Sequence, residues 1–268
     1  MTFDELRSLK DKAQRQALGF YLAEGEHLVL ELGKALARRS ALLTSRILVS
    51  HEYLAAGLPV GFPMQLPRET LNARQMSQLS DTRSPQGVMA IVPILPAPSP
   101  TPGERAIYLH EIQDPGNLGT LLRSLAWFGG FRCLLSPDSV DPYNPKVVRA
   151  SMGAVFRLPF ETEVTLETLR PRYARIALMD IGGRSITAEG DTARGLVAAD
   201  CLMFGNEGRG ASAEMRALAG DAVFSIAGDG PDDSRGGTSG LAVESLNLAT
   251  TVALCAYELI RVAKIPSR

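Results

Sequence analysis

The chain has 268 residues, of which 45% are hydrophobic and 21% charged, and this length and composition are typical of a globular protein with two ordinary domains. Its net charge of −1 gives no global signal for nucleic-acid binding, although it does not exclude a local basic patch. Three widely separated cysteines without a Cys-x-x-Cys pair argue against a disulfide framework or a metal site and fit a cytoplasmic protein. We expect neither a signal peptide nor a membrane span, because the start is charged and no apolar run reaches roughly 18–20 residues.

Residues 1–92 predict a small α/β domain. The chain opens with a basic amphipathic helix that ends at Gly19. Strands and helices then alternate, with strands at 20–24, 47–49 and 88–92 and helices at 26–39 and 69–79. The last strand is continuously apolar, as expected for a sheet that is covered on both faces.

Basic residues gather in this first domain. It holds 11 Lys/Arg against 9 Asp/Glu, a net charge of +2, so the remainder of the chain is near −3. They lie in the first helix and near the end of the second: Arg7, Lys10, Lys12, Arg15, Arg38 and Arg39. Two interpretations stay open, namely solvated helix faces and a phosphate-binding surface, to which Arg149 of the later chain is a further candidate.

Residues 93–104 contain five prolines, so this segment cannot form a helix or a central strand. We interpret it as a semi-rigid linker. It separates the first domain from a second domain at residues 105–268.

The second domain alternates short apolar strands with helices, and glycine-containing loops follow several of the strands. The strands are expected at 106–109, 133–135, 176–179, 201–204 and 222–226. This alternation predicts a largely parallel sheet with one ligand crevice at the strand ends. A GxGxxG fingerprint and a Gly-Lys-Ser/Thr phosphate loop are both absent, and no histidine is placed for a Ser-His-Asp or Cys-His hydrolase.

Polar residues follow two of these strands and precede the last helix. After the first strand we expect Asn117 in the turn and Arg123 on the helix. Glu207 lies among three glycines after another strand, where a carboxylate either caps a helix or takes part in chemistry. Residues 240–247 lead from a glycine loop into the apolar last helix, which is either an ordinary capped helix or one wall of a ligand site.

Three segments of the second domain contain motifs that can be compared with known families: Asn117-Leu-Gly-Thr-Leu-Leu-Arg123, Leu202-Met-Phe-Gly-Asn-Glu-Gly-Arg-Gly210 and Glu244-Ser-Leu-Asn-Leu-Ala249. Together, in this order, they resemble the SpoU (TrmH-type) branch of the SPOUT RNA methyltransferases. The intervening residues 141–146 and 149–154 are also similar to that family. Residues 20–27 and 80–88 resemble the substrate-binding domain of its rRNA-directed members, so the resemblance covers almost the whole chain.

The resemblance implies an α/β fold in two parts, a small substrate-binding domain followed by a SPOUT domain whose mostly parallel sheet is tied in a trefoil knot. It also implies S-adenosylmethionine as methyl donor, a ribose 2′-hydroxyl of RNA as acceptor, no metal, and a homodimer formed through the C-terminal domain. Ribosomal RNA is the leading substrate. A tRNA substrate, and a non-catalytic RNA-binding or ribosome-assembly role on the same scaffold, stay open as alternatives.

The resemblance also assigns site residues. Arg123 is the catalytic residue, and four others shape the catalytic site: Asn117, Glu207, Ser245 and Asn247. The donor is contacted by Phe204, Gly205, Gly208, Ile226 and Leu246. Arginine is a poor base, so we expect Arg123 to orient the hydroxyl and stabilise its developing charge, or to pass its proton to a neighbouring phosphate. The identity of a general base stays open.

The chain departs from the family pattern just before the third motif. The usual Ile-Pro-Met is replaced by Ile226-Ala-Gly, and roughly ten extra residues, rich in Gly, Asp and Ser, extend the segment at 227–240. Three interpretations stay open: a lid over the donor, an insertion that weakens donor binding, and a solvated loop that leaves the pocket intact.

Overall fold

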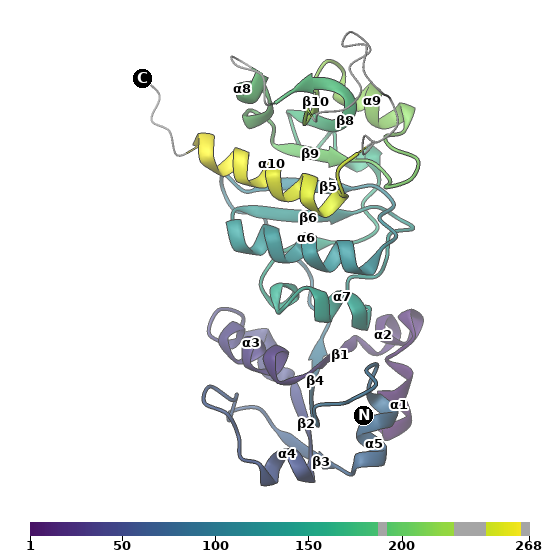
Figure 1. Cartoon of the computed structure of the whole chain (residues 1–268), viewed down its shortest axis with the longest axis vertical. Coiled ribbons are helices and arrows are strands. Elements are labelled where there is room, and N and C mark those ends of the chain that lie inside the picture. The colour runs from purple at the N-terminus through teal and green to yellow at the C-terminus, as the bar shows by residue number, and fades with distance from the viewer. Residues whose placement is uncertain (187–191, 228–244, 264–268) are drawn as a thin grey trace, which may run out of the picture. The chain divides into compact units, whose positions relative to one another are not determined.

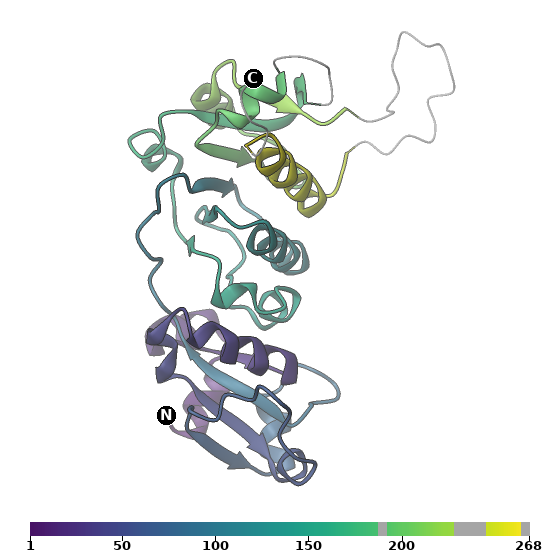
Figure 2. The ribbon, with the colours of Figure 1, turned by 90° about the vertical axis from the view of Figure 1, so that its left-hand side faces the viewer.

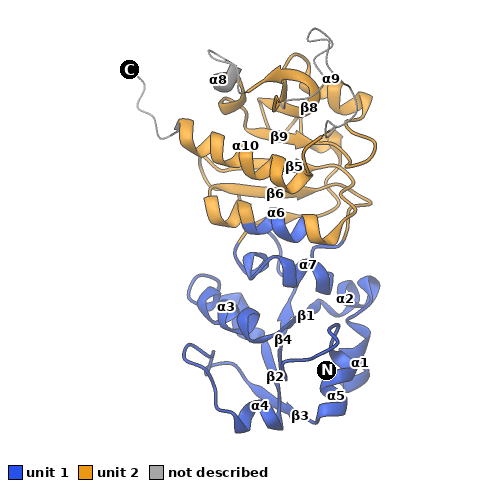
Figure 3. Cartoon of the chain, in the orientation of Figure 1, with its two compact units in different colours: residues 1–97, 118–123, 141–157 blue, residues 98–117, 124–140, 158–268 orange. Residues whose placement is uncertain are grey.

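The computed structural model describes residues 1–186, 192–227 and 245–263 (Figure 1). The chain divides into two compact units (Figure 3). Unit 1 comprises residues 1–97, 118–123 and 141–157, and unit 2 comprises residues 98–117, 124–140 and 158–268. Each unit is built around its own sheet.

The sheet of unit 1 has four strands in the order β1-β4-β2-β3. Their bounds are β1 (Phe20–Glu24), β2 (Arg46–Ser50), β3 (Arg68–Leu71) and β4 (Val88–Pro93). β4 pairs antiparallel with β1 and β2, and β2 pairs parallel with β3. Every residue of β4 is buried, which confirms the prediction of a strand covered on both faces.

Helix α3 (Glu26–Leu36) lies on one face of this sheet, and α1 (Phe3–Ser8) and α5 (Ala73–Leu79) lie on the other (Figure 1). Unit 1 also contains α2 (Lys12–Leu18), α4 (His51–Ala55), α7 (Pro145–Ala150), which contacts the edge strand β1, and the 3-10 turns η1 (Ser40–Thr44) and η2 (Ala154–Phe156). Leu6 and Leu9 near α1 and Met76 and Leu79 of α5 pack together on one face of the sheet.

Two predictions for this region are wrong. The first helix is split into α1 and α2, because the carboxylate of Asp11 accepts a hydrogen bond from the Gln14 amide and starts a new helix. The helix expected at 69–79 begins only at residue 73. Asn72 and Gln75 form a capping box there, and the preceding residues pair with β2 as strand β3.

The sheet of unit 2 has six strands in the order β10-β8-β9-β5-β6-β7, and all its pairings are parallel. The strands are β5 (Arg105–Leu109), β6 (Phe131–Leu135), β7 (Phe160–Glu161), β8 (Ile176–Ser185), β9 (Cys201–Phe204) and β10 (Val223–Ser225). The prediction of an α/β fold with a largely parallel sheet is therefore confirmed. β9 is apolar and buried at every residue, as expected for a strand that is covered on both faces. β6 is also buried throughout, although it contains Arg132, which pairs with Glu104 and Glu161.

The remaining elements are α6 (Pro115–Phe128), α8 (Thr192–Val197), α9 (Ala213–Ala219), α10 (Leu248–Ala263) and the 3-10 turn η3 (Leu166–Thr168). α6 contributes residues to both units. α6 and α10 lie side by side, with the Phe128 and Tyr257 rings 6.3 Å apart (Figures 1 and 2). Within the described ranges, no helix is both long and apolar enough to cross a membrane.

Candidate functional site

The first turn of α6 carries the first candidate side chain. The Asp114 side chain caps the helix by accepting a hydrogen bond from the backbone amide of Asn117 at 2.7 Å, and Pro115 occupies the first helical position. Asn117 is therefore the third residue of the helix, and its predicted place in the preceding turn is wrong. The Asp-Pro pair starts the helix earlier than we expected, and the Asn117 side chain projects from a fixed backbone.

A tight loop follows β9. The backbones of Asn206 and Gly210 exchange two hydrogen bonds of 3.0 and 2.8 Å. Inside the loop, the Asn206 side-chain oxygen accepts from the amides of Gly208 and Arg209, both at 3.0 Å. A Cβ added to Gly205 would lie 2.5 Å from the Gly210 backbone, so only glycine fits at the base of this loop.

This loop is also attached to the connection that leads from β5 to α6. The Asn206 side-chain amide donates to the Glu111 carbonyl oxygen at 2.9 Å, and Glu111 and Arg209 form an ion pair. β5 and β9 are parallel neighbours, so their carboxyl ends reach the same edge of the sheet. The loop after β9 and the start of α6 are thereby held together.

Three candidate residues from distant segments are joined by hydrogen bonds at this edge. The side-chain amide of Asn117 donates to the Glu207 carboxylate at 2.5 Å, and the side-chain amide of Asn247 donates to the Asn117 side-chain oxygen at 2.9 Å. The Asn247 oxygen in turn accepts from the amides of Ala249 and Thr250 at the start of α10. Asn247 is thus both a helix cap and a part of the candidate site.

In the part of the chain that the structure describes, no hydrogen bond or ion pair joins the other candidate residues to these three. Arg123 is exposed on α6, about 9 Å beyond Asn117 along the helix axis at the usual rise per residue. Among the described residues it makes no hydrogen bond or ion pair. Ser245 and Leu246 are exposed, and Ile226 directly follows β10 and is half-buried.

The donor-contact candidates on β9 and its loop differ in exposure. Phe204 is buried at the end of the strand, Gly205 is half-buried, and Gly208 is exposed. The insertion at 227–240, apart from Ala227, and Glu244 lie outside the described residues.

The structure shows three residues that hold the candidate site together and that the sequence did not single out. Asn206 and Glu111 hold the loop after β9, and Asp114 starts α6. The Asp114-Pro115 pair is a recognisable helix-start signal. The role of Asn206 depends on a carbonyl oxygen 95 residues away, which no local pattern reveals.

Several basic residues, for which solvated helix faces and a phosphate-binding surface were both open, have carboxylate or carbonyl partners within unit 1. Arg15 is buried with 3% of its side chain exposed and pairs with Asp141, so neither interpretation holds for this residue. Lys10 donates to the Ser80 carbonyl oxygen at 2.8 Å. Arg149 forms an ion pair with Asp81 at 2.8 Å, so its guanidinium is already engaged by a carboxylate.

The three cysteines are free and buried. Burial raises the pKa of Cys201 and of Cys255 to about 12 in each case, and it raises the pKa of Cys133 further. Near neutral pH these thiols are protonated, and they are therefore poor nucleophiles.

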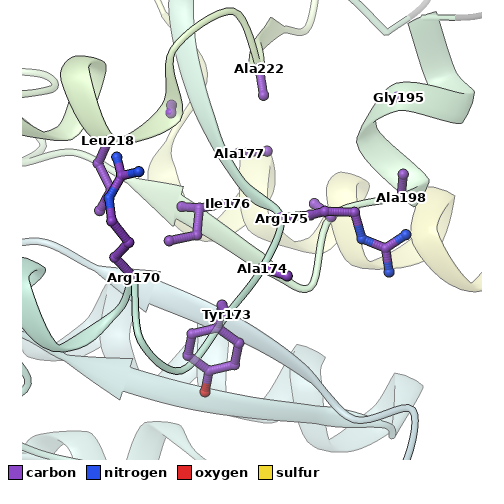
Figure 4. A pocket seen from close by; sticks show the side chains of 12 residues that line it. Arg170, Tyr173, Ala174, Arg175, Ile176, Ala177, Gly195, Ala198, Leu218 and Ala222 are labelled. Carbon is purple, nitrogen blue, oxygen red and sulfur yellow. The ribbon is translucent and has the colours of Figure 1, made fainter.

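A cavity of about 370 Å³ opens at the amino end of β8 (Figure 4). Arg170, Tyr173 and Arg175 line it together with mostly small apolar residues. A hydrogen bond from Arg175 to Asp200, 2.7 Å long, lowers the pKa of that carboxyl group. None of the predicted site residues lines this cavity, which lies at the opposite end of the strands from Asn117 and Glu207.

Two family models match the chain. The model described as the SpoU rRNA Methylase family matches residues 104–257. The model described as an MRM3-like substrate binding domain matches residues 4–90.

Curated relatives carry names of the same kind. The chain is 34% identical over 169 residues to the mouse mitochondrial rRNA methyltransferase 3. The aligned region covers 60% of this chain and 39% of that protein. It is 28% identical over 153 residues to the Bacillus subtilis 23S rRNA (guanosine(2553)-2'-O)-methyltransferase, covering 57% of this chain and 58% of that protein. The chain thus spans less than two thirds of the length of both relatives.

Solved structures match over nearly the whole chain. A TrmH-family protein from Porphyromonas gingivalis is 29% identical with a TM-score of 0.73, covering 97% of both chains. An AdoMet-bound rRNA methyltransferase from Sinorhizobium meliloti is 25% identical with a TM-score of 0.72, covering 97% of this chain and 94% of that one.

Proposed function

The chain belongs to the SpoU rRNA methylase family, and from this premise we propose that it transfers a methyl group from S-adenosylmethionine to a ribose 2′-hydroxyl of ribosomal RNA. Support for the donor comes from the Sinorhizobium relative, whose structure holds AdoMet. Support for the 2′-hydroxyl comes from the Bacillus relative, which is named for that position.

Residues 1–92 are the proposed RNA substrate-binding domain and residues 105–268 the methyltransferase domain, with 93–104 as the linker. The match of the MRM3-like substrate binding model to residues 4–90 supports this division. We propose the cytoplasm as the compartment, and a trefoil knot in the second domain by analogy with the family.

The hydrogen-bonded group of Asn117, Glu207 and Asn247 is the observation that carries the proposal. It brings polar side chains from three distant segments to one edge of a parallel sheet, where α/β proteins bind their ligands. A positioned hydroxyl needs such donors and acceptors, because orientation supplies much of the rate of a group transfer.

The chain offers surfaces that fit the donor. Gly205 and Gly208 leave bare backbone at the carboxyl end of β9, while Ile226 and Leu246 supply apolar surface that is partly accessible. Bound there, S-adenosylmethionine supplies an electrophilic methyl group. The backbone of 204–208 and these two apolar side chains would hold its adenosine part.

Arg123 is the proposed catalytic residue. A guanidinium keeps its proton near neutral pH, so it cannot act as the base. It donates hydrogen bonds that orient the ribose hydroxyl and stabilise the negative charge that develops on its oxygen.

We also propose a homodimer formed through α6 and α10. These neighbouring helices expose large hydrophobic residues: Trp127 at 85%, Tyr257 at 53% and Leu254 at 44%. Sedimentation velocity of the wild type and of Trp127→Glu would test this, and a monomeric wild type would contradict it.

A non-catalytic RNA-binding role is the second candidate, and the insertion at 227–240 favours it because it interrupts the third motif. A tRNA substrate is the alternative within the enzymes. Calorimetric titration with S-adenosylmethionine separates the first two, since a scaffold protein would bind RNA without binding the donor.

The proposed catalytic role is tested by Arg123→Ala. Losing a transition-state donor should reduce methyl transfer by about 10²–10³-fold while donor affinity stays unchanged. Arg170→Ala, which removes an exposed arginine beside the remote cavity, serves as the matched control and should retain full activity. Near-normal turnover by Arg123→Ala would refute the assignment, and mapping 2′-O-methyl sites in cells with and without the gene would identify the substrate.

A further inference from the structure

A buried ion pair joins α2 to the segment that precedes α7. Side-chain exposure is 3% for Arg15 and 11% for Asp141. Nε of Arg15 donates to the Asp141 carboxylate at 2.9 Å, and Nη2 bonds to the same oxygen. Nη1 donates to the carbonyl oxygens of Leu9 and Lys10, both at 2.8 Å, so the guanidinium is fixed from three directions.

Asp141 also organises the turn that leads into α7. Its second carboxylate oxygen accepts from the Tyr143 amide at 3.0 Å, and its carbonyl oxygen accepts from the Asn144 amide at 3.0 Å. Asn144 then caps α7 through its side chain. The Tyr143 ring packs 4.7 Å from the Tyr21 ring of β1, so the start of α7 is held by residues of the N-terminal sheet and helices.

α7 in turn contacts α6 at Gly119. A Cβ on Gly119 would lie 2.8 Å from the Val147 carbonyl oxygen and would collide with the Ala150 side chain, so the two helices meet at backbone distance. Arg123 follows Gly119 by four residues and therefore lies on the same side of α6. All of these residues belong to unit 1 (Figure 3).

We propose that Arg15 and Asp141 are positioning residues that hold α7 against Gly119 and thereby set the place of Arg123. Through this link, a shift of the N-terminal domain when RNA binds would be passed to the helix that carries Arg123, although the two are distant in sequence. The outer ion pairs Arg149–Asp81 and Arg157–Glu31, at 2.8 and 2.7 Å, reinforce the same contact. The inference rests on the proposed function for the role of Arg123.

The kinetic test compares Arg15→Met with Arg46→Met. Arg46 is the matched control, because it is an arginine of the same unit whose ion pair with Glu69, at 2.9 Å, is partly exposed. Rates are measured with S-adenosylmethionine and with rRNA from cells lacking the gene, and are normalised to donor-binding sites. Arg15→Met should lower kcat about 10–100-fold, since small misplacements of a catalytic group have effects of that size. KM for the RNA and Kd for the donor should stay within about threefold of wild type.

A purely structural role would give a different pattern. It would lower the unfolding midpoint and leave kcat per folded site unchanged, and this outcome would overturn the inference. Asp141→Asn, which keeps the side-chain shape, takes the place of Arg15→Met if that variant does not fold. Gly119→Ala and Arg15→Met should be non-additive in kcat, because they act on one contact.

Hydrogen exchange tests the same link without any activity. Amides of residues 118–123 should exchange faster in Arg15→Met than in wild type or Arg46→Met, and equal exchange would refute the coupling. If the wild type transfers no methyl group, the proposed function fails, and the exchange result alone then decides the inference. If the wild type is active and Arg15→Met matches it, only the inference fails.

Discussion

The two edges of the parallel sheet in unit 2 are built in opposite ways. At the carboxyl edge, the side chains of Asn117, Glu207 and Asn247 bond to one another across distant segments. At the amino edge of β8, a cavity of about 370 Å³ is lined mostly by small apolar residues (Figure 4). One of its polar residues, Arg175, forms an ion pair with Asp200. We propose from this comparison that convergent polar groups, more than an open volume, mark the place where this chain positions a reacting group.

Among the substitutions that test this comparison, Gly205→Ala should cause the largest loss of donor affinity and turnover. The added Cβ would lie 2.5 Å from the Gly210 backbone, so the loop after β9 must shift. Overpacking of this kind costs about 1–3 kcal/mol, which corresponds to roughly 10–100-fold in donor affinity and turnover. Titration calorimetry and methyl-transfer rates measure both quantities.

Gly182→Ala is the matched control for that variant. Gly182 lies on β8, and nothing lies within 4 Å of a Cβ added there. It should behave as wild type, and similar losses in both variants would show that the packing of the Gly205 loop has no special role.

Asn117→Asp should have the next largest effect. The new carboxylate cannot donate to Glu207 and places like charges together, at a cost of about 1–1.5 kcal/mol, or roughly tenfold in turnover at neutral pH. The defect should shrink as pH falls, because one carboxylate of the pair then binds a proton. Rates of variant and wild type between pH 5 and pH 8 test this, and a defect that is independent of pH would contradict the charge argument.

Asn72→Asp provides the control for that exchange. Asn72 caps α5 as a hydrogen-bond acceptor, and aspartate serves there equally well. Turnover of this variant should equal that of the wild type at every pH.

Ala198→Leu should have the smallest effect. Ala198 is exposed and lines the cavity at the amino edge, so leucine would fill part of that space. We expect turnover within about twofold of wild type and a change of at most about 0.5 kcal/mol in the free energy of unfolding. A tenfold loss of turnover would move the functional site to this edge and reverse the comparison.

The sequence predicted the parallel sheet because short apolar strands such as β9 alternate with helices. It also marked Asn117, Glu207 and Asn247, which the structure brings together. The sequence-based predictions failed where an interaction partner is distant in sequence or where a helix-capping residue was overlooked. Arg15 looks like a surface residue until Asp141, 126 residues away, is placed beside it. Residues 69–71 look helical in the sequence, but in the structure they pair with the parallel strand β2.

The set of segments that makes up unit 1 limits where this chain can be joined to a relative in a chimaera. Residues 141–157 belong to the same compact body as residues 1–97, through the contacts of Arg15 and Tyr21 with Asp141 and Tyr143. A chimaera that exchanged only the part before the proline-rich linker would separate Asp141 from the Arg15 with which it pairs. A substrate-binding domain taken from a relative should therefore be transplanted with that relative's own segment equivalent to 141–157, as a single inherited block.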